Sequence, residues 1–128
     1  MSKHSILKGA LKLNTGDRFK FNLPLIIFEE GDAVVCYCPA LDLSGYGNTE
    51  GEAVDSYKYV MGEYFDYTVK KKTLVADLKK HGWAISKSAH KKMTPPTMTK
   101  ILETNEDFQR VFNNYSYKKI DTNISIPA

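Results

Sequence analysis

The residues best suited to nucleophilic or metal chemistry are two cysteines and three histidines, and their spacing matches no known site. Cys36 and Cys38 are two positions apart in a predicted strand, so their side chains share one face with Cα atoms about 7 Å apart, too far for a disulfide. His4, His81 and His90 complete no zinc spacing with them. Neither cysteine begins a helix, and no serine lies in a Gly-x-Ser-x-Gly turn. The sequence therefore predicts no catalytic residue, no metal site, no cofactor and no enzymatic activity.

A second candidate is Gly45-Tyr46-Gly47, which comes just before a predicted helix. Glycines let a backbone approach a phosphate closely, and a helix N-terminus attracts anions. However, Glu50 stands where a dinucleotide-binding motif has its third glycine, and Glu50 and Glu52 would repel a phosphate. We therefore interpret the two glycines as a tight turn that leads into the helix.

Charge is strongly segregated along the chain, although the net charge is only +3. Residues 29–66 hold nine acids against Lys58 alone, and residues 67–100 hold nine lysines against Asp77 alone, which gives −8 and +8. Acidic surfaces for basic partners give this pattern, as do basic surfaces for nucleic acid, solvated faces and internal ion pairs. Acids steer a cationic partner and tyrosines anchor it. The candidate partner-binding residues are Asp42, Tyr46, Glu52, Asp55, Tyr59 and Glu63.

The elements that must position these residues begin with a predicted β-hairpin. Residues 18–30 alternate and then stay apolar, which predicts a strand that becomes buried on both faces. Pro24 favours an edge position or a bulge in this strand. Gly31 and Asp32 supply a turn before residues 33–38, which are β-branched and aromatic. The two strands should therefore pair antiparallel.

The main helix is predicted to begin at a capping box formed by Thr49 and Glu52. We expect Gly62, inside this helix, to allow close packing, because it otherwise costs about 1 kcal/mol relative to alanine. The apolar stripe that should pack on the sheet consists of Ala53, Tyr57, Val60, Met61, Tyr64, Phe65 and Thr68.

The rest of the chain is predicted to contain shorter elements. Residues 73–80 should form a helix that ends at Gly82 in a left-handed conformation. Residues 83–85 should re-enter the sheet as a strand, and residues 86–96 should form an exposed connection. Three further elements are expected near the C-terminus: helices at 98–102 and 107–113, and a strand at 115–126.

Residues 27–32, 34–47 and 49–53 combine a hairpin, a Pro-x-Leu turn, a Gly-x-Gly stretch and a Thr-x-x-Glu-Ala helix start. This combination resembles the HicB-like antitoxin family, specifically over about residues 21–69. The resemblance implies an α+β fold, a β-β-β-α-β partial ribonuclease-H-like domain with an antiparallel sheet packed on one main helix. With 128 residues we expect a single domain, whose core covers about 18–88 and whose C-terminal extension covers about 97–128.

The resemblance also implies a small antitoxin that dimerises and neutralises a small basic HicA-type ribonuclease by covering its active surface. Residues 97–128 are too short for a helix-turn-helix, so specific DNA binding is not expected. We expect residues 70–92 to bind nucleic acid weakly. Residues 1–13 lack the apolar core of a secretion signal and no apolar run spans a membrane, which predicts a cytoplasmic protein. The alternatives are a dimeric regulatory or sensor domain without a toxin and, less favoured, a metal-dependent nuclease.

Overall fold

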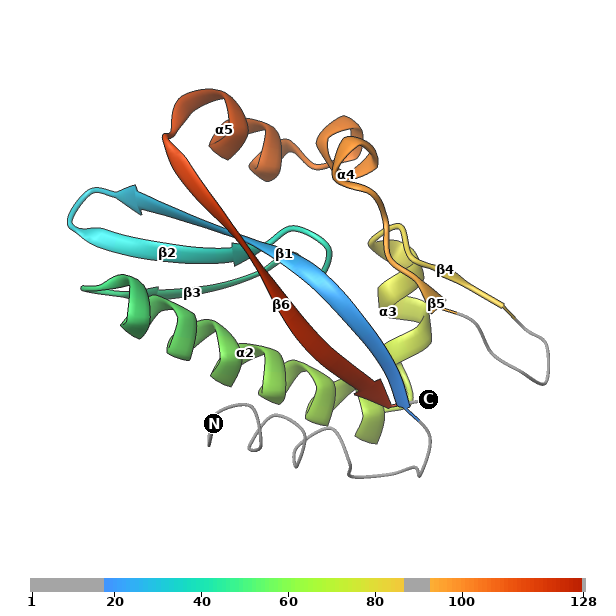
Figure 1. Ribbon diagram of the computed structural model, residues 1–128. Helices are drawn as coiled ribbons and strands as arrows, with labels where there is room; N and C mark the ends of the chain where they lie inside the picture. Colours follow the sequence, from blue (N-terminus) through green and yellow to red (C-terminus); the bar gives the residue numbers. More distant parts are fainter. Residues whose placement is uncertain (1–17, 87–92, 128) are drawn as a thin grey trace.

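The computed structural model describes residues 18–86 and 93–127 and shows a sheet with helices on both of its faces (Figure 1). The main sheet is antiparallel, with strand order β3-β2-β1-β6. Helix α2 lies along one face, and α4 and α5 lie on the opposite side. The strands are β1 (Arg18–Glu30), β2 (Ala33–Cys38), β3 (Leu43–Gly47), β4 (Ala84–Ile85), β5 (Met93–Thr94) and β6 (Tyr117–Pro127). The helices are α2 (Glu50–Lys70), α3 (Leu74–Lys80), α4 (Met98–Thr104) and α5 (Glu106–Asn114). The predicted α+β class is confirmed.

The predicted hairpin is confirmed, and it explains how Pro24 fits into a strand. The β1–β2 ladder runs from Glu30, opposite Ala33, to Ile26, and Pro24 lies beyond its end. On the other side Pro24 lies opposite Asp121 of β6. Because proline has no N–H to donate, it is tolerated where β1 has no β2 neighbour.

Helix α2 begins at the predicted capping box, with one difference in its hydrogen bonds. The Thr49 hydroxyl oxygen accepts from the Glu52 N–H at 3.1 Å. The Glu52 carboxylate accepts from the Asn48 N–H at 2.8 Å. The helix presents one buried stripe to the sheet, made of Ala53, Tyr57, Met61, Phe65 and Thr68.

The expectation that residues 83–85 re-enter the main sheet is wrong. Strand β4 pairs with β5 in a separate two-stranded sheet, and the place beside β1 is taken by β6. β6 pairs with β1 at every position from 18 to 28, whereas β4 has 2 residues. The Trp83 side chain is buried: its Nε1–H donates to the Ala40 carbonyl at 2.8 Å, and its ring lies edge-on to Phe21 at 5.1 Å.

The two predictions for glycines around the helices have opposite outcomes. Gly82 adopts a φ of +93° after α3, so the predicted left-handed position is confirmed. Gly62 does not mediate close packing, because a Cβ added there would meet no atom within 4 Å. The close approach to the sheet occurs instead at glycines of β3.

The C-terminal extension shares the core of the preceding elements. One cluster of buried residues includes Leu23 of β1, Met61 of α2, Phe108 of α5 and Ile124 of β6. The predicted C-terminal helices and strand are confirmed as α4, α5 and β6. The expectation for residues 1–13, and most of that for residues 86–96, lies outside the described residues. Within the described ranges no helix has both the length and the apolar character needed to cross a bilayer.

Candidate functional site

The Gly45-Tyr46-Gly47 stretch of β3 serves the packing of α2. A Cβ on Gly45 would lie 2.0 Å from the backbone nitrogen of Tyr57, and one on Gly47 would lie 2.5 Å from the Glu52 Cβ. Both glycines therefore face α2 at distances that no side chain permits. Tyr46, between them, points to the opposite face of the sheet. The interpretation of these glycines as a tight turn is wrong, because they belong to β3 and pair with β2. Their role is to allow the close approach of α2.

Four of the six candidate partner-binding residues lie together on α2. Asp55, Tyr59 and Glu63 are spaced four residues apart, and Glu52 lies one turn before Asp55, all on the side away from the buried stripe. Tyr59 is 70% exposed and has an acid one turn before it and one turn after it. We call Glu52, Asp55, Tyr59 and Glu63 the acidic α2 face. Glu52 also has the capping role described above.

The structure does not bring the other two candidates, Asp42 and Tyr46, to the acidic α2 face. Asp42 lies in the turn after β2 with a φ of +55°. Its Oδ1 accepts hydrogen bonds from the Tyr37 hydroxyl at 2.7 Å and from Asn105 Nδ2 at 3.3 Å. Asn105 caps α5, so Asp42 links the sheet to the C-terminal helices. The six predicted residues therefore belong to two surfaces.

A cleft of ≈ 230 Å³ lies on the Tyr46 side, between the sheet and α5. Glu30 Oε2 in this cleft accepts from the Tyr115 hydroxyl at 2.8 Å and from Arg110 Nη1 at 3.1 Å. These two bonds, that of Tyr115 first, lower the pKa of the Glu30 carboxyl below its usual range. Burial, followed by the bond to Asp42, raises the pKa of the Tyr37 phenol. Tyr37 is therefore neutral and can donate to Asp42, and the polar groups here hold α5 on the sheet.

Part of the acidic segment is neutralised inside the molecule. Besides Glu30 with Arg110, Glu50 pairs with Lys118 of β6 at 2.9 Å and Asp66 pairs with Lys70 at 3.2 Å. Internal ion pairs therefore account for part of the charge segregation seen in the sequence. Exposed ion pairs contribute little to stability, typically below about 1 kcal/mol each.

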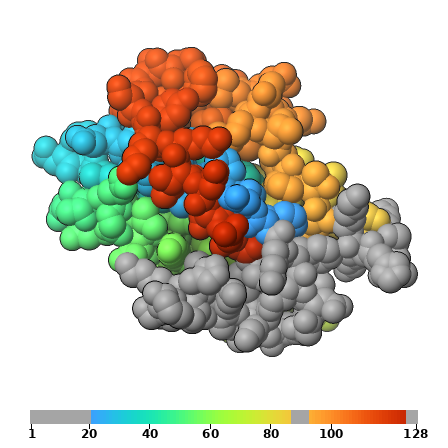
Figure 2. Space-filling view, in the orientation of Figure 1, coloured from blue at the N-terminus to red at the C-terminus, as the bar shows by residue number. Residues whose placement is uncertain are grey.

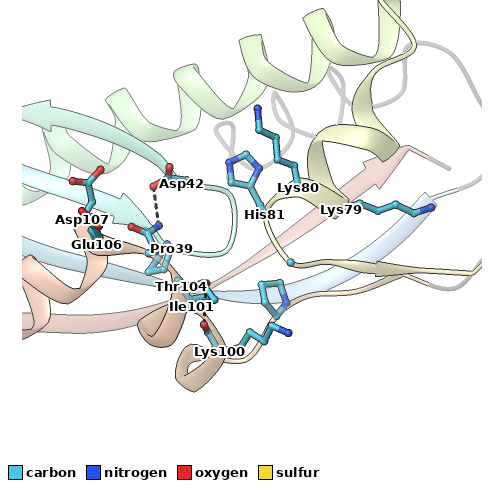
Figure 3. A pocket seen from close by; sticks show the side chains of 13 residues that line it. Pro39, Asp42, Lys79, Lys80, His81, Lys100, Ile101, Thr104, Glu106 and Asp107 are labelled. Atoms are coloured by element: carbon cyan, nitrogen blue, oxygen red, sulfur yellow. Dashed lines mark hydrogen bonds between the residues drawn. The ribbon is translucent and has the colours of Figure 1, made fainter.

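A larger pocket of ≈ 560 Å³ lies between the end of α3, the turn after β2, and α4 (Figure 3). Its lining mixes charges of both signs, with Lys79 and Lys80 on α3 and Asp42 across the pocket. Figure 3 shows Lys79 pointing away from His81. His81 Nδ1 lies 2.9 Å from the Asp77 carbonyl oxygen, as a helix-terminal histidine often does.

The two cysteines are free and buried in β2. Burial is the main cause of the raised pKa of the Cys36 thiol, which is about 12. Cys36 is therefore a thiol at neutral pH and a poor nucleophile. Among the described residues no three histidine, cysteine, aspartate or glutamate side chains are grouped to hold a metal ion.

The polar residues that hold α5 were missed by the sequence reasoning. The Asn105–Tyr37 and Tyr115–Glu30 bonds join residues 68 and 85 positions apart. Sequence spacing does not predict contacts between residues so far apart in the chain. The helix start is different, because Asn105 directly before Glu106 and Asp107 fits an N-cap pattern. Comparison of the chain with known protein families, curated proteins and solved structures finds no match. The acidic α2 face is therefore a candidate recognition surface that rests on its geometry alone.

Proposed function

We propose that this protein is a HicB-like antitoxin, which binds a small basic ribonuclease toxin of the HicA type and covers its active surface. The observation that carries the proposal is the acidic α2 face, where Tyr59 is 70% exposed between Asp55 and Glu63. An exposed aromatic ring with carboxylates on both sides is suited to a cationic, RNA-binding surface.

The two residue types on this face have different roles in binding. The carboxylates of Asp55 and Glu63 attract a cationic partner over a distance and raise the association rate, but they add little affinity while they are solvated. The ring of Tyr59 supplies apolar area at a low entropic cost and becomes the desolvated contact. The partner would also gain cation–π contacts if an arginine or lysine lies over this ring.

The order of elements supports the same proposal. β1, β2, β3 and α2 follow one another in the β-β-β-α order that the HicB-like resemblance implies. In this proposal β6 takes the role of the last strand of the partial ribonuclease-H-like domain. The partner is a protein surface, and sequence-specific DNA binding is not part of the proposal.

Co-expression with the neighbouring small basic protein tests this function. We expect Asp55→Lys combined with Glu63→Lys to abolish growth rescue and co-purification, and Tyr59→Ala to weaken the complex about tenfold or more. The matched control is Glu29→Lys with Asp32→Lys, which changes net charge equally at exposed positions of the β1–β2 hairpin.

The outcomes of this experiment distinguish the hypotheses about function. Loss of rescue only in the α2 variant supports the proposal, whereas equal loss in the hairpin control shows that net charge alone matters. Rescue unchanged in both variants contradicts the acidic α2 face. If no partner is toxic or co-purifies, the antitoxin function is wrong and the sensor-domain alternative replaces it.

A further inference from the structure

The C-terminal strand β6 is an open edge of the main sheet. In the order β3-β2-β1-β6 it has β1 on one side and no described strand on the other. Its residues Tyr117, Lys118, Lys119, Asp121 and Asn123 are exposed, and Figure 2 shows the red C-terminal segment on the front surface. It is 11 residues long, with its only proline at Pro127. Open sheet edges of this length are usually blocked in native proteins, because their unpaired backbone N–H and C=O groups can pair with a strand of another chain.

The β1–β2 hairpin determines which residues of β6 point their backbone groups outward. A two-residue turn is closed by a hydrogen-bonded residue pair, which here is Glu30 with Ala33. Every second residue of β1, from Glu30 back to Ile26, therefore directs its backbone N–H and C=O groups to β2. Ile26 therefore does not bond to Lys119, which lies opposite it in β6. Pro24, without an N–H, fits the same alternation opposite Asp121. Odd-numbered β6 residues thus direct their N–H and C=O groups to the open edge.

Only one symmetric register satisfies the backbone and also places opposite charges opposite each other. Two copies of β6 that pair antiparallel must place odd residues opposite odd residues. Centring the pair on Asp121 or Lys119 would put identical charges directly opposite each other, which is unfavourable. Centring it on Ile120 puts Lys119 of each copy opposite Asp121 of the other. Lys118 then lies opposite Thr122 and keeps its bond to Glu50.

From this complementarity we propose that two copies of this chain associate through their β6 strands about Ile120, which joins their sheets into one. The partner is a second copy rather than another protein, because the Lys119–Asp121 match is self-complementary under a two-fold axis. The inference is independent of the proposed function, since it concerns the edge of the sheet and not the acidic α2 face.

Charge reversal in the full-length protein tests the interface by sedimentation. We expect Lys119→Asp or Asp121→Lys alone to raise the dimer dissociation constant about tenfold, because two opposite-charge pairs become like-charge pairs. The two variants mixed together should form a heterodimer, since each supplies the charge that the other needs. The double variant should again form a homodimer, and Lys100→Asp, on α4, should behave as the wild type.

Cysteine cross-linking tests the register. At the centre of the proposed pair the Ile120 Cα atoms form a non-bonded pair about 4.5 Å apart, which suits a disulfide. Ile120→Cys should therefore cross-link the dimer under mild oxidation. Thr122→Cys, which is half-buried like Ile120, should not cross-link the dimer. The two copies of this position would lie about 13 Å apart along the strands. The native cysteines are buried and do not compete.

Several outcomes would overturn the inference. The wild type could remain monomeric at millimolar concentration, or its dimer could be unaffected by both charge reversals. Cross-linking at Thr122 but not at Ile120 would also contradict the register. A strand of another protein bound at β6, with no self-association, would assign the edge to a different partner and overturn the proposal.

Discussion

On one face of the main sheet α2 lies so close to β3 that a Cβ on Gly45 would touch the backbone of Tyr57. On the other face α5 is connected to the sheet by polar bonds, from Asn105 to Tyr37 and Asp42, and from Glu30 to Arg110. The first contact depends on shape, and the second adds pairing of polar groups to the burial of Phe108 and Val111. Substitutions should therefore affect the two faces by different mechanisms.

The difference also changes the interpretation of the acidic residues. Asp42 and Glu30, on the α5 face, use their carboxylates to hold an element of the fold. Asp55 and Glu63, on α2, lie on a helix that its apolar stripe already fixes to the sheet. The carboxylates of Asp42 and Glu30 therefore help to hold α5 on the sheet, whereas the position of α2 is explained by its apolar stripe.

The largest effect should come from Gly45→Ala, which breaks the contact that depends on shape. The added methyl group meets backbone atoms of Ser56 and Tyr57, so α2 must move away from β3 and lose apolar contact. We expect a loss of about 3 kcal/mol in the free energy of unfolding, measured by urea denaturation.

Gly62→Ala, in α2 itself, is the matched control for Gly45→Ala in β3. A Cβ there meets nothing within 4 Å, so the same substitution should stabilise the protein by about 1 kcal/mol through helix propensity. Equal effects at the two glycines would show that α2 is not held by close approach.

The elements that could be predicted from the sequence are those with local signals. The capping box at Thr49 and the helical spacing of Ala53, Tyr57 and Met61 determine where α2 begins and which side it buries. The alternation of β1 and its two-residue turn to β2 likewise depend on neighbouring residues. The acidic α2 face follows from that spacing, which is why four of the six candidate residues lie together.

What could not be predicted depends on pairing between distant residues. Residues 83–85 have the composition of a strand, but the place beside β1 goes to β6, which pairs with β1 at every position from 18 to 28. The placement of Asp42 likewise depends on Asn105, 63 positions away. Periodicity shows that a segment can be a strand and does not show which neighbour it will take.

The second prediction removes the polar link on the α5 face. Asn105→Ala deletes the N-cap acceptor for the Phe108 N–H and the donors to Tyr37 and Asp42. We expect a loss of about 2 kcal/mol by urea denaturation. Asn105→Ser keeps a capping oxygen and should recover part of the loss. Asn105→Asp also keeps the cap but places a second carboxylate near Asp42, so stability equal to the wild type would contradict a role for the link beyond capping.

The smallest effect is expected at Glu30, and its dependence on pH identifies its cause. Hydrogen bonds from Tyr115 and Arg110 lower the pKa of Glu30 in the folded protein, so they stabilise the fold above its unfolded-state pKa. This stabilisation is lost as the pH falls through the folded-state pKa. Glu30→Gln should therefore be less stable than the wild type at neutral pH, and the difference in the free energy of unfolding should shrink as the pH falls below the unfolded-state pKa of glutamate. Glu29→Gln, an exposed neighbour, removes the same charge as a control. A difference for Glu30→Gln that stays constant with pH would show that the carboxylate's charge does not strengthen the link to α5.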